Sequence, residues 1–208
     1  MYAGTPPLEA LRLLVSEAAT IEDHEEDNDK VIMINDVARA FFEAPAYREI
    51  CVELPEEVRT TEDEEQDNVA FLQKSLYGTR DAAQHFQNEV RKIMTSIGFE
   101  SGGYNACTYF HRKRNLLSMV HGDDFATTGK EEDTKWLETK LKERFEIKTH
   151  LIGKKENMSQ EGKVLNRVLR RTEDGWEYEA DPRHAELLVK SLKLEEAKPV
   201  STAGEDET

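Results

Sequence analysis

The chain has 208 residues, of which 38% are hydrophobic and 34% are charged, so we expect one ordinary domain, or one domain plus appendages, with a packed core and a highly charged surface. The formal net charge of −15 has the wrong sign for a tight, free-standing nucleic-acid binder, because phosphate contacts need Lys and Arg. No apolar run is long enough to span a bilayer, so we expect no membrane partner and an intracellular protein, in the cytoplasm or the nucleus.

The first third of the chain alternates short apolar runs with acidic stretches. The pattern predicts, in order, a helix at residues 7–19, an acidic loop at 21–29, a buried strand at 31–34, a helical turn at 38–44, a strand at 50–54, an acidic loop at 56–68, a strand at 70–72 and a turn at 75–78. Cys51 and Cys107 lie far apart without metal-site spacing and are expected to be free thiols.

The rest of the chain continues the alternation of helices and strands. We expect a long helix at residues 81–97, strands at 107–110 and 116–120, a tight turn at 121–124, a strand at 125–127, a helix at 131–144, strands near 164–170 and 176–179, a helix at 182–192 and a disordered acidic tail at 195–208. This order is typical of an α+β domain, a mostly antiparallel sheet with helices packed on one face.

Two adjacent carboxylates, Asp123 and Asp124, follow His121-Gly122 between two apolar runs. Their charges repel, and a pair of divalent cations would offset that repulsion, because carboxylate oxygens are ligands that Mg²⁺ prefers. Two such ions can clamp the attacking and leaving oxygens of a phosphoryl transfer. The alternative is an ordinary turn, since Gly and Asp are common turn residues.

Asp36 comes just after the buried run at residues 31–34 and would stand at an edge of the sheet. By itself it could cap the helical turn that begins at Val37. If adjacent strands bring it to Asp123 and Asp124, the three carboxylates suit a two-metal site.

Two further segments have both a structural and a functional interpretation. Phe41, five residues after Asp36, could pack under the sugar of a nucleotide or belong to the core. Residues 74–78 precede the long helix, where a phosphate can approach, but they also suit a strand-to-helix turn with a positive φ at Gly78. The six histidines show no ligand spacing and are expected to be scattered on the surface, and the basic residues 111–114 to form a solvated hairpin tip.

Several stretches between residues 7 and 153 form a longer pattern. They read D-V-A-R-A-F-F-E-A-P, E-I-C-V-E-L-P, L-Q-K-S-L-Y-G-T-R-D-A-A-Q-H-F, S-I-G-F-E, V-H-G-D-D-F and E-R-F-E-I-K. In order and spacing they resemble copia-type retrotransposon reverse transcriptases, including the segment around the first catalytic Asp and the family's K-S-L-Y-G-L-K-Q-A-P-R-x-W.

The resemblance implies a right-hand polymerase palm with partial fingers over residues 1–153 and a thumb or connection remnant over residues 154–194. It implies an RNA-directed DNA polymerase, a nucleotidyltransferase that adds dNTPs to a primer 3′-hydroxyl with two Mg²⁺ ions, or Mn²⁺ in their place. The partners would be an RNA or DNA template-primer, dNTPs and other segments of a retrotransposon Pol polyprotein.

The resemblance also assigns residues by position. The metal-binding, catalytic acids would be Asp36, Asp123 and Asp124. Phe41 would be the gate against ribonucleotides, with Ala40 lining the same nucleotide pocket. The incoming nucleotide and template would lie near Ser75, Tyr77 and Gly78, and the leaving pyrophosphate near Lys148.

The sequence departs from the family pattern in three places. An upstream fingers segment with triphosphate-binding Lys and Arg is not found, Tyr-Val-Asp-Asp reads His-Gly-Asp-Asp, and Q-A-P-R-x-W reads D-A-A-Q-H-F. Activity would therefore require that the missing fingers be supplied. Two other interpretations stay open, a degenerate and inactive retroelement fragment and an acidic interaction module whose Asp pair is only a turn.

Overall fold

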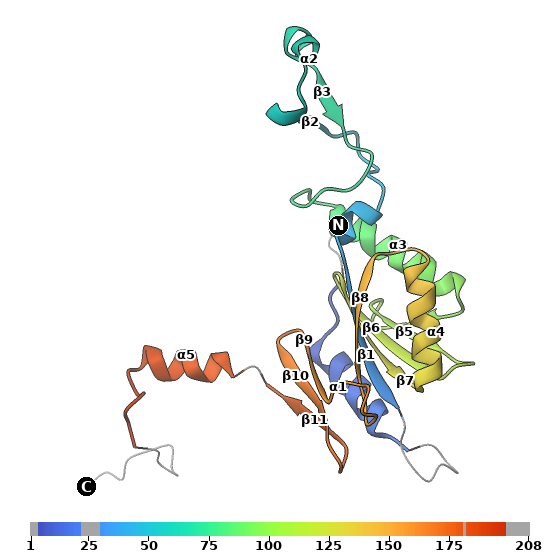
Figure 1. Cartoon of the computed structure of the whole chain (residues 1–208), viewed down its shortest axis with the longest axis vertical. Coiled ribbons are helices and arrows are strands. Elements are labelled where there is room, and N and C mark those ends of the chain that lie inside the picture. Colours follow the sequence, from blue (N-terminus) through green and yellow to red (C-terminus); the bar gives the residue numbers. More distant parts are fainter. Residues whose placement is uncertain (1–3, 22–29, 181, 199–208) are drawn as a thin grey trace.

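The computed structural model describes residues 4–21, 30–180 and 182–198 (Figure 1). Its centre is a six-stranded antiparallel sheet in the order β4-β5-β6-β7-β1-β8, which confirms the α+β class. The strands are β1 (Val31–Val37), β4 (Glu100–Ser101), β5 (Thr108–His111), β6 (Leu116–His121), β7 (Asp124–Gly129) and β8 (Ile147–Ile152). Strand β8 forms one edge of this sheet and was not predicted.

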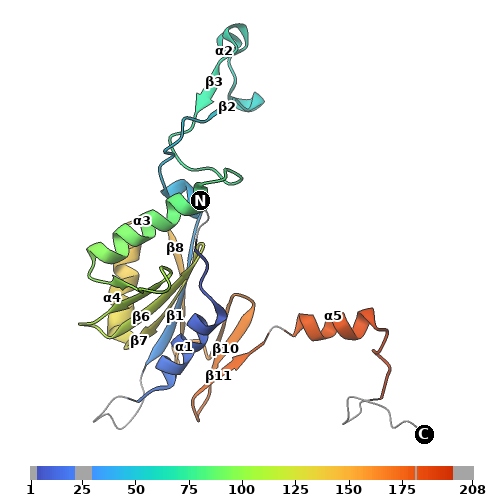
Figure 2. The same cartoon turned by 180° about the vertical axis from the view of Figure 1, so that it is seen from behind.

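Helices cover both faces of the central sheet, so the prediction of helices on one face needs correction (Figures 1 and 2). Helices α3 (Ala82–Ser96) and α4 (Glu131–Lys142) pack with the side of β1 that carries Met33 and Val37. Helix α1 (Leu8–Ala19) packs with the other side, which carries Ile32 and Ile34. The physical reason is that β1 is apolar at successive positions, and a strand with two apolar faces needs a cover on each.

A second, three-stranded sheet shares the face covered by α1 (Figure 1). It consists of β9 (Glu161–Val164), β10 (Arg167–Arg171) and β11 (Trp176–Glu179). Where one strand was predicted near residues 164–170, the chain reverses at Leu165 and Asn166, whose φ angles are 49° and 61°. Two positive φ angles in a two-residue loop are typical of a type I′ hairpin, and Leu-Asn lacks the glycine that usually signals one.

An arm projects from the body at one end of the sheet (Figure 1). It consists of the strand pair β2 (Cys51–Glu53) and β3 (Val69–Phe71), with η2 (Glu56–Val58) and α2 (Thr61–Gln66) between them. The predicted loop at residues 56–68 is therefore wrong. Helix α2 begins at a capping box, in which Thr60 Oγ1 accepts from the amide of Asp63 and the Asp63 carboxylate accepts from the amide of Thr60.

The remaining predicted elements are largely confirmed. The short helix η1 (Ala40–Glu43) follows β1, and α5 (Arg183–Ser191) lies apart from the central sheet (Figure 2). Both cysteines are free, with Cys107 buried and Cys51 exposed. The predicted loop at residues 22–29 and most of the predicted tail at 195–208 lie outside the described residues. No helix in the described part of the chain combines the length and apolar composition that crossing a bilayer requires.

Candidate active site

The sheet brings together the three acids that the sequence singled out. Asp36 on β1 lies directly opposite Asp124 on β7. Directly paired residues of antiparallel strands project from the same face, with Cβ atoms about 4.5–5.5 Å apart. The amide of Val37 donates to the carbonyl oxygen of Asp123 at 3.0 Å, which ties the β6–β7 turn to β1. Asp36 is thus part of β1, and the interpretation of Asp36 as a helix cap is wrong.

The turn that carries Asp123 has two central residues, Gly122 and Asp123, between the paired His121 and Asp124. The φ of Gly122 is 62°, whereas Asp123 is not among the positive-φ residues. A positive φ at the first central residue only is the pattern of a type II′ turn, in which glycine avoids strain. Asp123 is exposed at the tip, and Asp124 is half-buried in the sheet.

The pKa of Asp124 is affected by the other two acids. Its pKa lies above the ordinary value of an Asp, first because burial disfavours the charged form, and then because Asp123 and Asp36 repel it. The neighbouring His121 opposes this shift. Negative charge is therefore concentrated at this end of the sheet.

Two further side chains extend the row of paired residues. Lys148 on β8 is the cross-strand partner of Asp36, and His121 on β6 is the partner of Asp124. The row His121, Asp124, Asp36 and Lys148 shares the face on which α1 packs further along the strands. Lys148 is exposed, so its ammonium group is available to a ligand.

In the described part of the chain, no group of three or more His, Cys, Asp or Glu side chains forms a preorganised metal site. This is compatible with Mg²⁺, which sites acting on phosphates usually hold with one or two carboxylates, substrate phosphates and waters. Asp36, Asp123 and Asp124 carry carboxylate oxygens of the type that Mg²⁺ prefers, and the first and third of them are direct cross-strand partners.

Phe41 lies at the boundary between core and surface. Its ring centroid is 4.4 Å from that of Tyr77 and 6.5 Å from that of Phe86. Ala40 is 1% exposed and belongs to the core on the α3 side. A cavity of about 60 Å³ is lined by Phe41, Phe86 and Gly122 among others, so Phe41 lies close to the turn that carries Asp123.

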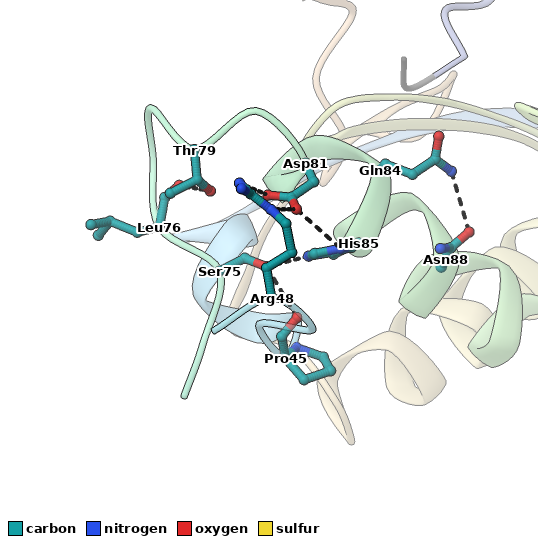
Figure 3. Close-up of polar contacts among 9 residues, drawn as sticks. All are labelled: Pro45, Arg48, Ser75, Leu76, Thr79, Asp81, Gln84, His85 and Asn88. Atoms are coloured by element: carbon teal, nitrogen blue, oxygen red, sulfur yellow. Dashed lines mark hydrogen bonds and ion pairs between the residues drawn. The ribbon is translucent and has the colours of Figure 1, made fainter. Parts of the chain in front are cut away.

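The segment at residues 75–78 divides into a buried and an exposed half. Ser75 is 3% exposed, and its amide donates to the carbonyl oxygen of Ala44 at 2.9 Å. Its hydroxyl donates to the carbonyl oxygen of Pro45 at 3.1 Å (Figure 3). Tyr77 is 49% exposed, and Gly78 has the predicted positive φ, 90°. Tyr77 and Gly78 are therefore accessible to a ligand. Ser75 is buried instead and anchors this segment to residues 44–45.

Sequence reasoning missed a polar network around Ser75 (Figure 3). The Arg48 guanidinium donates to both carboxylate oxygens of Asp81, at 2.5 and 3.2 Å. This hydrogen bonding lowers the pKa of Asp81 to about 2. His85 joins Ser75 to this pair, with Nδ1 3.0 Å from Ser75 Oγ and Nε2 3.9 Å from Asp81 Oδ2. The available signal was the i,i+4 spacing of Asp81 and His85, which puts them on one helix face.

The Ser75, His85 and Asp81 set is not a hydrolase triad. A nucleophilic Ser must reach a substrate, and Ser75 is buried. The network is a structural one.

His111 also corrects the prediction that the histidines lie on the surface. It is 7% exposed, with its ring 5.1 Å from that of Phe99 and 5.3 Å from that of Trp136. The amide of Arg114 donates to His111 Nδ1 at 3.2 Å. The His111 ring therefore fills the core behind the basic turn.

The fold and the site together define a class of protein. It is an α+β domain in which acidic residues of neighbouring antiparallel strands lie side by side at one end of the sheet. The family model described as reverse transcriptase (RNA-dependent DNA polymerase) matches residues 4–158. The match covers most of the chain, and the chain belongs to this family. It includes all six strands of the central sheet, the arm and helices α1, α3 and α4.

Proposed function

We propose that the chain is the palm-containing core of a copia-type reverse transcriptase from a retrotransposon Pol polyprotein. It adds dNTPs to the 3′-hydroxyl of a primer on an RNA or DNA template. The observation that carries this proposal is the β1–β7 register, which sets Asp36 opposite Asp124 and ties the Asp123 turn to the same strand.

The three acids are the proposed ligands of two Mg²⁺ ions, or of Mn²⁺. When bound, such ions supply charge stabilisation to the attacking and leaving oxygens of phosphoryl transfer. Asp123 is exposed at the turn and meets the incoming substrate, while Asp124 and Asp36 are held in the sheet by main-chain pairing. The acids are thus placed before substrate arrives, which is the arrangement that electrostatic catalysis needs.

The nucleotide pocket is proposed to lie between the acids and the exposed half of residues 75–78. Phe41 provides the surface beneath the sugar, and Tyr77, whose ring contacts that of Phe41, forms a side wall of the pocket. Ala40 and Ser75 are buried and form the part of the core on which the pocket rests. Lys148, the cross-strand partner of Asp36, is proposed to meet the leaving pyrophosphate.

The charge of the chain bears on its partners. The net charge of −15 over the whole chain disfavours the binding of a template-primer by this chain alone, so other Pol segments supply the cations that hold nucleic acid and triphosphate. We propose that this assembly acts inside the cell, in the cytoplasm or the nucleus, without a membrane partner.

Primer extension tests the proposal. The full chain, alone and with a copia-type fingers segment supplied in trans, is given template-primer, dNTPs and Mg²⁺ or Mn²⁺. Asp36→Asn and Asp123→Asn should each reduce synthesis by at least about 100-fold while the circular dichroism spectrum stays unchanged. The matched control Asp174→Asn, in the β10–β11 turn, should keep full synthesis.

The outcomes separate the three interpretations. Synthesis retained in Asp36→Asn or Asp123→Asn overturns the polymerase proposal. No synthesis under any condition, with cation binding still lost in Asp123→Asn, indicates an inactive fragment. A melting temperature that no divalent cation changes, in wild type and Asp123→Asn alike, indicates an interaction module in which the acids only form a turn.

A further inference from the structure

The base of the arm is a continuous ribbon of two chain segments. Main-chain hydrogen bonds join Ser75 to Ala44 at 2.9 Å, Ala46 to Gln73 at 3.1 Å and Leu72 to Ile50 at 2.9 Å. The two segments therefore move together, and whatever holds one of them to the body also holds the other.

The ion pair between Arg48 and Asp81 joins this ribbon to α3 (Figure 3). Arg48 comes from the first segment, and Asp81 is the N-cap residue of α3. The contact is bidentate, a geometry that restricts orientation as well as distance. The Asp81 carboxylate makes no capping bond to its own helix, so its hydrogen bonds go to the ribbon instead.

His85, one helical turn further on, holds the second segment. The carbonyl oxygen of Pro45 can only accept, so the Ser75 hydroxyl donates its proton there and accepts from His85 Nδ1 at 3.0 Å. The ring of His85 also meets Tyr47 edge-on, with centroids 4.8 Å apart. Ser75 is thereby held through its amide, its hydroxyl proton and its hydroxyl oxygen.

Tyr77 follows Ser75 by two residues and lies against the aromatic pair of η1. Its ring is 4.4 Å from that of Phe41 and 5.6 Å from that of Phe42. Because Tyr77 is half exposed, core packing alone does not determine its position. The position of Tyr77 therefore depends largely on the backbone between Ser75 and Tyr77.

We propose that Arg48, Asp81 and His85 are positioning residues, a clamp that holds Ser75 and so sets Tyr77 over Phe41. The clamp rests on the proposed function in one respect, that Phe41 and Tyr77 border a nucleotide pocket. Exposed ion pairs add little to global stability, so loss of the clamp changes the position of Tyr77 more than the stability of the fold.

Fluorine NMR of the full chain labelled with 3-fluorotyrosine tests the clamp, with the Tyr77 resonance assigned from Tyr77→Phe. Asp81→Asn and Arg48→Met should each shift that resonance, and the double variant Arg48→Asp with Asp81→Arg should return it toward the wild-type position. His85→Gln, which keeps the ion pair, should also shift it. His85→Gln provides the test of the clamp if a substitution at Asp81 impairs folding.

The matched control is Arg112→Met. Arg112 makes the same kind of bidentate contact, with Glu100 at 2.8 and 3.1 Å, away from the clamp. Its loss should leave the Tyr77 resonance in place. A Tyr77 resonance that does not move in Asp81→Asn or His85→Gln overturns the clamp.

Titration of the same samples with dATP and Mg²⁺, with the fingers segment of the primer-extension test supplied in trans, separates the clamp from the proposed function. In wild type the nucleotide should shift the Tyr77 resonance, and Asp81→Asn should weaken this binding by about fivefold or more, as expected when preorganisation is lost. No nucleotide effect in wild type counts against the proposed function, while the clamp is still judged from the resonance itself. A moved resonance with unchanged dATP affinity overturns the positioning role.

Discussion

Lys148 on β8 is the direct cross-strand neighbour of Asp36 on β1. The other neighbour of Asp36, on β7, is Asp124. Asp36 therefore lies between a carboxylate and an ammonium group on one face of the sheet. Opposite charges in direct register stabilise a strand pair modestly, and the exposure of Lys148 leaves its ammonium free to reach a phosphate.

Lys148→Gln is expected to lower the catalytic efficiency of primer extension, kcat/KM for dNTP, by about tenfold or more. The reason is that a hydrogen bond to a charged group contributes roughly 1.5–3 kcal/mol. Steady-state kinetics with the assembly used for primer extension measures the change. Lys113→Gln, at an exposed hairpin tip, should keep the wild-type value. Equal efficiencies for the two variants would show that Lys148 does not meet the substrate.

Asp124→Asn is expected to raise the free energy of unfolding at pH 7, in the presence of EDTA, by roughly 0.5–2 kcal/mol. The folded-state pKa of Asp124 lies above its unfolded value because of burial and its acidic neighbours. Its favourable contribution is complete below the unfolded pKa of 3.8 and is lost as the pH rises through the folded pKa. Urea unfolding at pH 7 and pH 3 should show the gain at pH 7 only. A gain of equal size at both pH values would mean that charge repulsion is not its source.

Arg48→Met is expected to lower the free energy of unfolding only slightly at pH 7, because the ion pair is exposed, and to lose that small effect in acid. The folded-state pKa of Asp81 is about 2, held down by the Arg48 hydrogen bonds, against an ordinary value of 3.8. The stability contributed by Asp81 is therefore complete above 3.8 and disappears as the pH falls toward 2. Thermal unfolding of wild type and Arg48→Met across this window measures the difference, which should shrink steadily. A difference independent of pH would contradict the assignment.

Phe86→Ala is expected to destabilise the fold by about 3–5 kcal/mol. Phe86 is 1% exposed, and its ring lies between Phe41 and Phe145, so the truncation leaves a cavity beneath the nucleotide pocket. Urea unfolding measures the loss. The control is Phe71→Ala, on the arm, where the side chain is half exposed and the change should stay within about 0.5 kcal/mol. Similar losses for both variants would contradict the core position of Phe86.

The long helices were predictable because their apolar residues recur at helical spacing. Helices α1, α3 and α4 each bury one such stripe against the sheet. The errors have local causes. Helix α2 buries no residue, so it shows no apolar period, and its start is marked only by the capping box at Thr60. Edge strand β8 alternates half-buried with exposed side chains over much of its length and shows no buried apolar run.

The acids of the candidate site were recognisable from their chemistry, but their meeting point was not. Adjacent carboxylates in a Gly-containing turn indicated a cation site, and Asp36 stood at the end of an apolar run. Only the register sets Asp36 opposite Asp124, because a slip of one residue would send Asp36 to the face covered by α3 and α4. The partnership of Arg48 with Asp81 was also beyond the sequence, since 33 residues separate them.

Sequence by itself determined the fold class, the three major helices and the identity of the acids, because each depends on residue type and short-range periodicity. Tertiary structure alone decided which face of the sheet carries Asp36, that helices cover both faces, and that His85 and Ser75 meet. Those outcomes depend on strand register and on contacts between distant segments, which no local pattern of residues encodes.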